Sequence, residues 1–382
     1  MTDNVGRPWT IGNVRLFDGE RLHDNAVVTI EGKTVAAVDT GAGWRGTVNV
    51  DGRGGLLMPG LIDAHVHVTT PEDLHQLAAH GITTALDMAS HSVSGLRRLR
   101  DAAGSTDLRT AGPPASAPGG LHTRLMGFPL DSAVSGPGDA ERFVAARAAE
   151  GSDYVKIIVE PPQAPAALDA DTVSALVRFS RQHGLLSVAH AAAHSAVELA
   201  VGATVDVVTH APLDRRLDDA LVARMADQGT VSVPTLTMMR AVSQLPPGSP
   251  AYRPGMDLTH AIQSVTAIRA AAVRLLVGTD ANTAPGTIVN VPPGRSMHDE
   301  LALLLDVGLS PLEALASATS LTADTFGLND RGLVTPGRRA DLVLLAGDPL
   351  TDIADSRSIV DVWIGGVRLP REPAEARVTT QP

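Results

Sequence analysis

The spacing of apolar positions in this chain changes near residue 57. Before that point, short runs of apolar and polar residues end at turn pairs such as Asp18-Gly19, which predicts short β-strands. After it, brief apolar runs alternate with longer segments rich in Ala, Leu and Arg, which predicts strands that alternate with helices. Strand patterns return near the end of the chain, at residues 337–345 and 359–364.

The middle of the chain contains eight predicted strands. They cover residues 61–68, 83–87, 108–112, 154–159, 185–190, 205–210, 231–235 and 274–280. Helical patterns separate them, among them residues 72–80, 140–150, 171–182 and 217–228. Such alternation predicts an α/β fold with a closed (β/α)₈ TIM barrel. An open doubly wound sheet is the alternative, but no Gly-x-Gly-x-x-Gly turn follows an early strand.

The two β-rich ends of the chain are expected to pack together. Residues 1–57 and 334–382 would form a small composite β-sandwich domain, and residues 58–333 would form the metal-dependent catalytic barrel. A chain of 382 residues is long enough for a barrel with a smaller domain beside it.

Composition narrows the possible functions. The net charge is −11 and no cluster of Lys and Arg is visible, so nucleic acid is not an expected partner. The chain has no cysteine, which excludes disulfides, thiolate metal ligands and a cysteine nucleophile. No stretch approaches the roughly 18 apolar residues of a membrane span, and the N-terminus lacks the apolar core of a signal peptide. We therefore expect a cytoplasmic protein without a membrane partner.

The chain contains only two lysines, Lys33 and Lys156, among its 31 basic residues. Lys156 lies within an otherwise apolar predicted strand. Burying its amine there is costly unless the amine is paired or modified, although a strand edge could leave it in water. Lysine can lower its pKa and react with CO₂ to form a carbamate, whereas arginine cannot do so readily. The choice of lysine at this position therefore indicates chemistry.

Histidines and one aspartate occur where predicted strands end. His65 and His67 are two residues apart on one strand, so their side chains point to the same face, although two solvated histidines would show the same spacing. His190, His210 and Asp280 each close a later predicted strand. Barrel enzymes place their sites at the C-terminal ends of their strands, so these groups predict a metal site there.

These motifs resemble those of the amidohydrolase superfamily, most closely its imidazolonepropionase-like branch, which includes ochratoxinase-type and Xaa-Pro dipeptidase-type enzymes. The resemblance extends over nearly the whole chain. It is carried by Leu-Met-Pro-Gly-Leu-Ile-Asp-Ala-His-Val-His at residues 57–67, Gly-Thr-Asp-Ala at 278–281, Glu-Ala-Leu-Ala-Ser-Ala-Thr at 313–319 and Pro-Gly-Arg-Arg-Ala-Asp-Leu-Val at 336–343.

The resemblance implies two divalent metal ions, with zinc as the usual metal. His65, His67 and Asp280 would hold one ion, and His190 and His210 the other. Lys156, carbamylated by CO₂, would bridge both ions together with a hydroxide. This hydroxide would attack the carbonyl carbon of an amide or peptide-like C–N bond, and Asp280 would pass its proton to the leaving nitrogen.

The resemblance also suggests the substrates and the assembly. A small-molecule amide, an N-acyl amino acid or a dipeptide is the expected substrate, and relatives are commonly homo-oligomers. One departure is Glu160-Pro161-Pro162 after the strand of Lys156, where relatives often have small residues. Because that loop borders the expected pocket, substrate preference stays open.

Four further residues are weaker candidates. His122 follows a Gly119-Gly120 pair that relatives also carry, so it could grip the scissile carbonyl or a substrate carboxylate. His298, which opens the helix after the last predicted strand, could face the pocket as a second catalytic group. Both could equally be ordinary loop or helix histidines. Arg240 and Tyr252 lie near long loops and could contact substrate, but surface positions explain them as well.

Other functions are compatible with parts of this pattern. A mononuclear deaminase or cyclic-amide hydrolase of the same superfamily would not need Lys156. A lactonase, ester hydrolase or phosphotriesterase relative would generally lack the flanking β segments. A non-enzymatic scaffold would not be expected to keep all six ligand positions.

Overall fold

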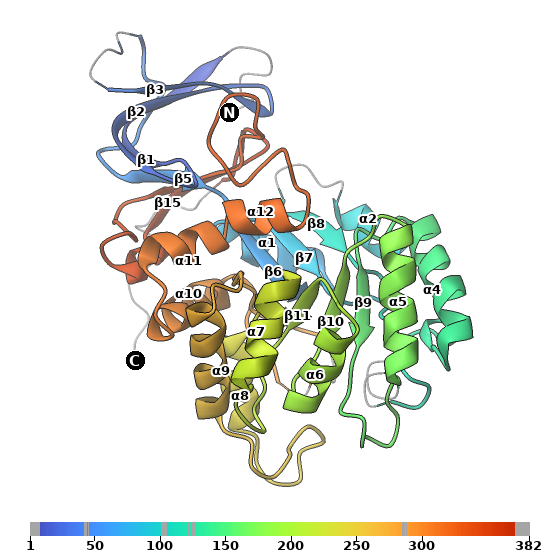
Figure 1. Cartoon of the computed structure of the whole chain (residues 1–382). Helices are drawn as coiled ribbons and strands as arrows, with labels where there is room; N and C mark the ends of the chain where they lie inside the picture. The colour runs from blue at the N-terminus through green and yellow to red at the C-terminus, as the bar shows by residue number, and fades with distance from the viewer. Residues whose placement is uncertain are drawn as a thin grey trace, which may run out of the picture.

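The computed structural model describes residues 8–41, 44, 46–100, 105–120, 123, 127–284, 287 and 289–370. Figure 1 shows two parts: a β-sheet layer near the N-terminus, and a larger body in which helices lie outside the parallel strands. The strand pairing forms one eight-stranded sheet and two four-stranded sheets.

The eight-stranded sheet combines both ends of the chain. Its order is β16-β15-β14-β5-β1-β2-β3, with β4 paired to β1. Its strands are β1 (Trp9–Phe17), β2 (Leu22–Glu31), β3 (Thr34–Thr40), β4 (Val50–Asp51), β5 (Leu56–Pro59), β14 (Leu342–Leu345), β15 (Ile359–Ile364) and β16 (Val367–Arg368). All eight strands belong to one hydrogen-bonded sheet rather than to two facing ones, so the predicted β-sandwich is not confirmed.

The two four-stranded sheets are parallel throughout. The first has the order β13-β6-β7-β8 and the second β12-β11-β10-β9. Their strands are β6 (Leu61–His67), β7 (Ile82–Asp87), β8 (Asp107–Thr110), β9 (Val155–Ile158), β10 (Ser187–His190), β11 (Val207–Thr209), β12 (Val231–Val233) and β13 (Ala281–Asn282).

Single bridges and hydrogen bonds join the edges of these two sheets. Ala115 bridges Ile157 on one side, and Ser232 bridges Leu275 on the other. The Ala64 amide donates to the Val277 carbonyl, which brings β6 beside the same segment. The arrangement is a TIM-barrel-like α/β fold, but its regular strand pairing does not run continuously around a closed barrel.

The eighth predicted strand differs most from the structure. Residues 274–280 carry no regular strand, and the short β13 begins only after Asp280. Asp280 has φ +57°, a left-handed conformation that interrupts an extended strand. The other seven barrel strands lie within the predicted segments or within two residues of them.

Helices lie outside the barrel strands, as Figure 1 shows for α4 to α7. Local signals start several of them: Thr70 and Asp73 form a capping box on α1, and Asp169 caps α5 by accepting from the Thr172 amide. The helices are α1 (Pro71–Ala79), α2 (Val93–Arg100), α4 (Pro137–Glu150), α5 (Ala170–Gln182), α6 (His194–Gly202), α7 (Asp219–Gln228), α8 (Leu236–Ser243), α9 (Leu258–Ala270), α10 (Arg295–Asp306), α11 (Pro311–Ser317) and α12 (Ser320–Thr325). Two 3₁₀ turns are η1 (Leu130–Ser132) and η2 (Ile353–Arg357).

Apolar side chains fill the inside of the barrel. This cluster includes Ile62, Ala64, Leu86, Val188, Val207 and Leu276 from the strands, together with Ala323 and Leu328 from α12 and the turn after it. The chain enters the barrel from β5 through Gly60. A Cβ there would lie 2.1 Å from the Thr83 hydroxyl oxygen, so only glycine fits this crossing.

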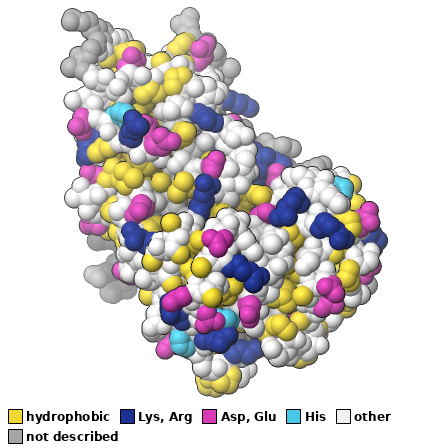
Figure 2. Space-filling view, viewed as in Figure 1, with side chains coloured by type: hydrophobic (Ala, Val, Ile, Leu, Met, Phe, Trp, Pro, Cys, Tyr) yellow, Lys and Arg dark blue, Asp and Glu magenta, His cyan; other side chains and the backbone are white. Residues whose placement is uncertain are grey.

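Figure 2 shows acidic and basic side chains interspersed over the visible face. Among the described residues, none of the helices combines the length and apolar character that crossing a bilayer requires.

Candidate metal centre

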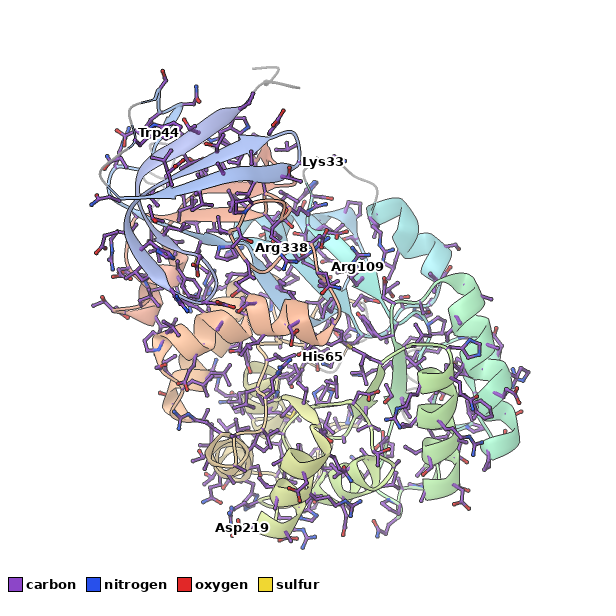
Figure 3. All side chains as sticks on the ribbon, turned by 45° about the horizontal axis from the view of Figure 1, so that its top comes forward. Lys33, Trp44, His65, Arg109, Asp219 and Arg338 are labelled. Carbon is purple, nitrogen blue, oxygen red and sulfur yellow. The ribbon has the colours of Figure 1, made fainter. Side chains whose placement is uncertain are left out.

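The residues predicted as metal ligands lie in or directly beside five of the barrel strands. His65 and His67 end β6, Lys156 lies in β9, and His190 ends β10. His210 directly follows β11, and Asp280 directly precedes β13. In the view of Figure 3, His65 lies farther from the eight-stranded sheet than Arg109 does. All except Lys156 therefore lie at the C-terminal ends of parallel barrel segments.

Four histidine rings and one carboxylate form a single cluster. The ring centroids of His65 and His210 are 5.0 Å apart, and those of His190 and His210 are 4.4 Å apart. Oδ1 of Asp280 lies 3.0 Å from Nε2 of His67 and 3.5 Å from Nε2 of His65. Its Oδ2 lies 3.8 Å from Nδ1 of His210. The structure thus brings together residues that are up to 215 positions apart in sequence.

Lys156 is buried within the same region, with 2% of its surface exposed. Its Nζ donates to the Thr209 hydroxyl at 2.9 Å, and that hydroxyl donates to the Ala189 carbonyl. Burial lowers the pKa of Lys156 to about 7, against the opposing charges of Asp280 and Asp87. A large part of the amine is therefore neutral, and nucleophilic, near pH 7.

The same burial affects the other titratable groups differently. It lowers the pKa of His65 well below its ordinary value, and the neighbouring positive charges of Lys156 and His210 lower it further. Burial also disfavours charged His67, but its hydrogen bond to Asp280 outweighs this and raises its pKa. Burial opposes ionisation of Asp280, yet the contact with His67 keeps its pKa below the usual range. Asp280 is therefore an anion among basic groups.

This donor set fits a divalent metal ion. One ligand atom from each of His65, His210 and Asp280 lies within 4.8 Å of the other two. Nδ1 of His65 is buried and has no hydrogen-bond partner. Imidazole nitrogens and a carboxylate oxygen are preferred ligands of Zn²⁺, and an unpartnered buried nitrogen is otherwise costly.

Two buried aspartates support the cluster and were not among the predicted site residues. Asp63 accepts from the His65 amide and from both the amide and hydroxyl of Thr279, which fixes β6 to the segment of Asp280. Asp87 accepts from the Thr110 hydroxyl and the Val68 amide. Burial raises the pKa of Asp63 to about 7 and that of Asp87 to about 6. Their signal in the sequence was an acidic residue inside an apolar strand pattern.

The backbone is strained around the cluster. His210, Thr235 and Asp280 have φ values of +77°, +48° and +57°. Left-handed conformations are costly for residues with a Cβ, and they concentrate at functional sites. These three residues follow β11, follow β12 and precede β13, so the strain lies at the end of the barrel that carries the ligands.

Of the four weaker candidates, the structure describes three, and these contact residues outside this cluster. His122 lies outside the described residues. The ring of His298 contacts the Ser356 hydroxyl at 2.9 Å and lies 6.1 Å from the ring of His80, between α10, η2 and the end of α1. Arg240 lies in the last turn of α8, and Tyr252 lies in the turn that follows Ser249. His298 therefore contacts Ser356 and His80, and its predicted catalytic role stays a prediction.

A barrel-like α/β fold with histidines and an aspartate at its strand ends, and a buried lysine within a strand, is typical of metal-dependent hydrolases. The sequence matches the amidohydrolase family over residues 56–369. The chain belongs to this family and is a hydrolase acting on carbon–nitrogen bonds. The resemblance seen in the sequence motifs is thereby confirmed.

Individual relatives are distant. The chain is 28% identical to an uncharacterized protein of Mycobacterium tuberculosis over 324 residues, which is 78% of this chain and 80% of the relative. It is 26% identical to adenine deaminase of Cereibacter sphaeroides over 344 residues, which is 81% of this chain but only 50% of the deaminase.

Solved structures show the same fold at low sequence identity. A Xaa-Pro dipeptidase with bound methionine is 20% identical, with a TM-score of 0.82 over 95% of this chain and 100% of that one. Ochratoxinase from A. niger is 18% identical, with a TM-score of 0.76 over 95% of each chain. These similarities concern the fold alone.

Proposed function

We propose that this protein is a binuclear metal-dependent amidohydrolase that cleaves an amide or peptide-like bond of a small molecule. The observation that carries the proposal is the burial of Lys156 in the barrel that carries the four histidines and Asp280. A single metal ion needs only three or four protein ligands, so a set of six is better suited to two ions.

The lysine is the most informative member of the set. A carbamate forms when a neutral amine attacks CO₂, and the lowered pKa of about 7 makes that neutral amine available. The carbamate would carry a negative charge on two oxygens, so it could contact two cations at once. It would also replace a costly buried ammonium group with an anion that the cations stabilise.

We assign His65, His67 and Asp280 to one ion, and His190 and His210 to the other, with carbamylated Lys156 between them. Zinc suits this mixture of nitrogen and oxygen ligands. When bound, the ions would supply Lewis-acid polarisation of the carbonyl and a water of lowered pKa.

Asp280 would carry the proton. Its depressed pKa keeps the carboxylate ionised, so it can accept a proton from the attacking water and return it to the leaving nitrogen. The 3.0 Å contact between His67 and Asp280 holds the carboxylate in place. Asp63 fixes the two segments that carry these residues, so their relative position depends on the buried Asp63–Thr279 contact.

The metal content of the purified protein tests this proposal. With bicarbonate present, the wild type should contain about two metal ions per chain, and Lys156→Ala should contain one or fewer. Lys33→Ala is the matched control, because Lys33 is exposed and is the only other lysine of the chain. About one ion in the wild type and in Lys156→Ala would contradict the binuclear site.

The substrate class is a further proposal that the relatives support, and it needs a separate assay. We propose a dipeptide or N-acyl amino acid, because the dipeptidase shares the fold over its whole length. Release of a new primary amine from a library of such compounds would support this assignment.

A mononuclear deaminase is the second candidate, because adenine deaminases are among the relatives. A deaminase would release ammonia from a heterocycle and would retain its activity in Lys156→Ala. The deaminase assignment would be contradicted if the wild type released a substituted amine and Lys156→Ala lost this activity.

A further inference from the structure

Helix α8 begins beside the metal centre without a side-chain cap of its own. Its N-cap residue is Thr235, a type that normally accepts a hydrogen bond from the first turn through its hydroxyl. Here the Thr235 hydroxyl makes no capping bond. Instead, its oxygen lies 2.9 Å from Nδ1 of His210.

Glu300, from helix α10, supplies the missing cap. Its Oε1 accepts from the Leu236 amide at 2.8 Å, and its Oε2 accepts from the Thr237 amide at 2.6 Å. Glu300 is fully buried, so its carboxylate depends on these bonds and on the positive end of the helix dipole. Two of the amides that a helix start leaves unpaired are thus bonded by a residue 63 or more positions away.

We propose that Glu300 is a positioning residue for the metal centre, because it caps α8 and leaves the Thr235 hydroxyl to hold His210. The inference rests on the proposed function in one respect: it assumes that His210 binds a metal ion. The contacts run from Glu300 to the first turn of α8, then to Thr235, and then to the imidazole of His210.

The strain at Thr235 shows why this chain of contacts needs an anchor. Its φ of +48° is unfavourable for a β-branched residue, so the conformation persists only if neighbouring contacts enforce it. Glu300 binds the amides of Leu236 and Thr237, the two residues after Thr235, and these bonds fix the backbone there. With the anchor gone, Thr235 could relax, cap the helix with its own hydroxyl and release His210.

The function of that hydroxyl is to orient the imidazole. A histidine binds a metal ion through one ring nitrogen, and a partner on the other nitrogen fixes the tautomer and the ring angle. Loss of such partners typically weakens metal binding about 10- to 100-fold. The same effect is expected whether the loss occurs at Thr235 or, indirectly, at Glu300.

The first test measures metal release from the purified protein to a chromophoric chelator, well below the unfolding temperature. Glu300→Gln and Thr235→Val should each release metal about tenfold faster than the wild type. The double variant should be no faster than Thr235→Val alone, because Glu300 acts through the hydroxyl that this variant lacks. Thr235→Ser keeps the hydroxyl and should restore the wild-type rate.

Glu313→Gln is the matched control, since Glu313 takes part in the capping box of α11 and contacts none of the proposed ligands. It should release metal at the wild-type rate. The inference would be overturned if the increase in release rate of the Glu300→Gln, Thr235→Val double variant equalled the product of the two single increases. An unchanged release rate in Glu300→Gln would also overturn it.

A second readout does not depend on metal. In chelator-treated full-length protein with ¹⁵N-labelled histidine, the Nδ1 resonance of His210 should move in the same direction in Glu300→Gln and Thr235→Val. Thr235→Ser and Glu313→Gln should leave it unchanged. If the wild type binds no metal but this resonance moves, the proposed function fails while the positioning role stands. If metal binds and the resonance does not move in Glu300→Gln, the positioning role fails alone.

Discussion

The two ends of the barrel differ in how completely their buried charged and titratable groups are paired. Toward the C-terminal end, Lys156 and four histidines surround Asp280, with the buried carboxyl groups of Asp63 and Asp87 nearby. At the N-terminal end, Arg331 is 3% exposed and contacts Asp107 and Asp330, with Asp341 at 4.0 Å. At the N-terminal end, Arg331 is paired with carboxylates of the protein. At the C-terminal end, basic groups outnumber acidic ones.

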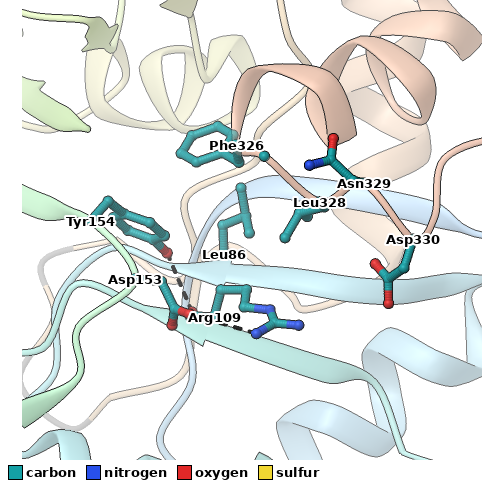
Figure 4. Close-up of a pocket in the computed structure, with 9 residues that line it drawn as sticks. Leu86, Arg109, Asp153, Tyr154, Phe326, Leu328, Asn329 and Asp330 are labelled. Carbon is teal, nitrogen blue, oxygen red and sulfur yellow. Dashed lines mark hydrogen bonds and ion pairs between the residues drawn. The ribbon is translucent and has the colours of Figure 1, made fainter. Parts of the chain in front are cut away.

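Figure 4 shows part of the N-terminal end, a cavity of about 370 Å³ where Arg109 faces Asp153. The Arg109 guanidinium lies 3.2 Å from Asp107 and 3.6 Å from Asp153. The hydroxyl of Tyr154 donates to the Asp87 carbonyl, and its ring packs against Phe326. Ionic and apolar contacts together hold the turn after α12 against the start of the barrel strands.

The difference separates a structural cluster from a functional one. A buried charge is tolerated when an opposite charge and hydrogen bonds compensate it. The N-terminal end meets this condition with protein groups. At the C-terminal end, the buried Nδ1 of His65 has no hydrogen-bond partner, and metal ions bound there would give such imidazole nitrogens a partner.

The largest expected effect is at the C-terminal end. Asp280→Asn keeps the size of the side chain but removes its charge and its ability to accept a proton. We expect kcat for the amide substrate to fall roughly 10⁴-fold, the upper range for loss of a general acid–base. Asp299→Asn, which changes a carboxylate paired with Arg357 at the surface, should keep wild-type kcat. A loss below tenfold in Asp280→Asn would show that another group moves the proton.

At the N-terminal end, the expected effect is on stability alone. Arg331→Met leaves Asp107, whose side chain is only 11% exposed, without its main partner, which should reduce the free energy of unfolding by about 4 kcal/mol. Denaturant unfolding measures this, and the metal content of the folded variant should stay at the wild-type value. Arg274→Met removes an exposed ion pair with Asp324 and should cost under about 1 kcal/mol. If both variants lost the same free energy of unfolding, the expected difference between buried and exposed ion pairs would be contradicted.

The smallest effect concerns His298, which lies at neither end. Burial, helped by the charge of Arg357, lowers its pKa from 6.5 to about 3. Between these values the unfolded chain binds more protons than the folded one, so stability falls as the pH drops below 6.5. From pH 7 to pH 5, this histidine should cost about 2 kcal/mol.

Denaturant unfolding at both pH values tests this expectation. His298→Asn should lack that part of the pH dependence, while His75→Asn, at an exposed histidine, should keep the wild-type dependence. A pH dependence unchanged by His298→Asn would place the titrating group elsewhere.

Much of the fold could be read from local patterns. Alternation of apolar runs with helical segments located seven of the barrel strands and the four helices named from the sequence, because side-chain periodicity reflects which face is buried. The same patterns failed at residues 274–280. An apolar run does not reveal that Asp280 takes a left-handed conformation, which depends on the neighbouring strands and on Asp63.

By itself, the sequence determined the kinds of residue available to the candidate metal centre. These are His65, His67, Lys156, His190, His210 and Asp280, each placed in or beside a predicted strand. Only the tertiary structure decided which of the candidates meet. It brought these six into one region, placed His298 against Ser356 instead, and set Glu300 on the helix that follows Thr235. Such contacts join residues far apart in the chain, and their energies depend on burial and on partners that no local pattern encodes.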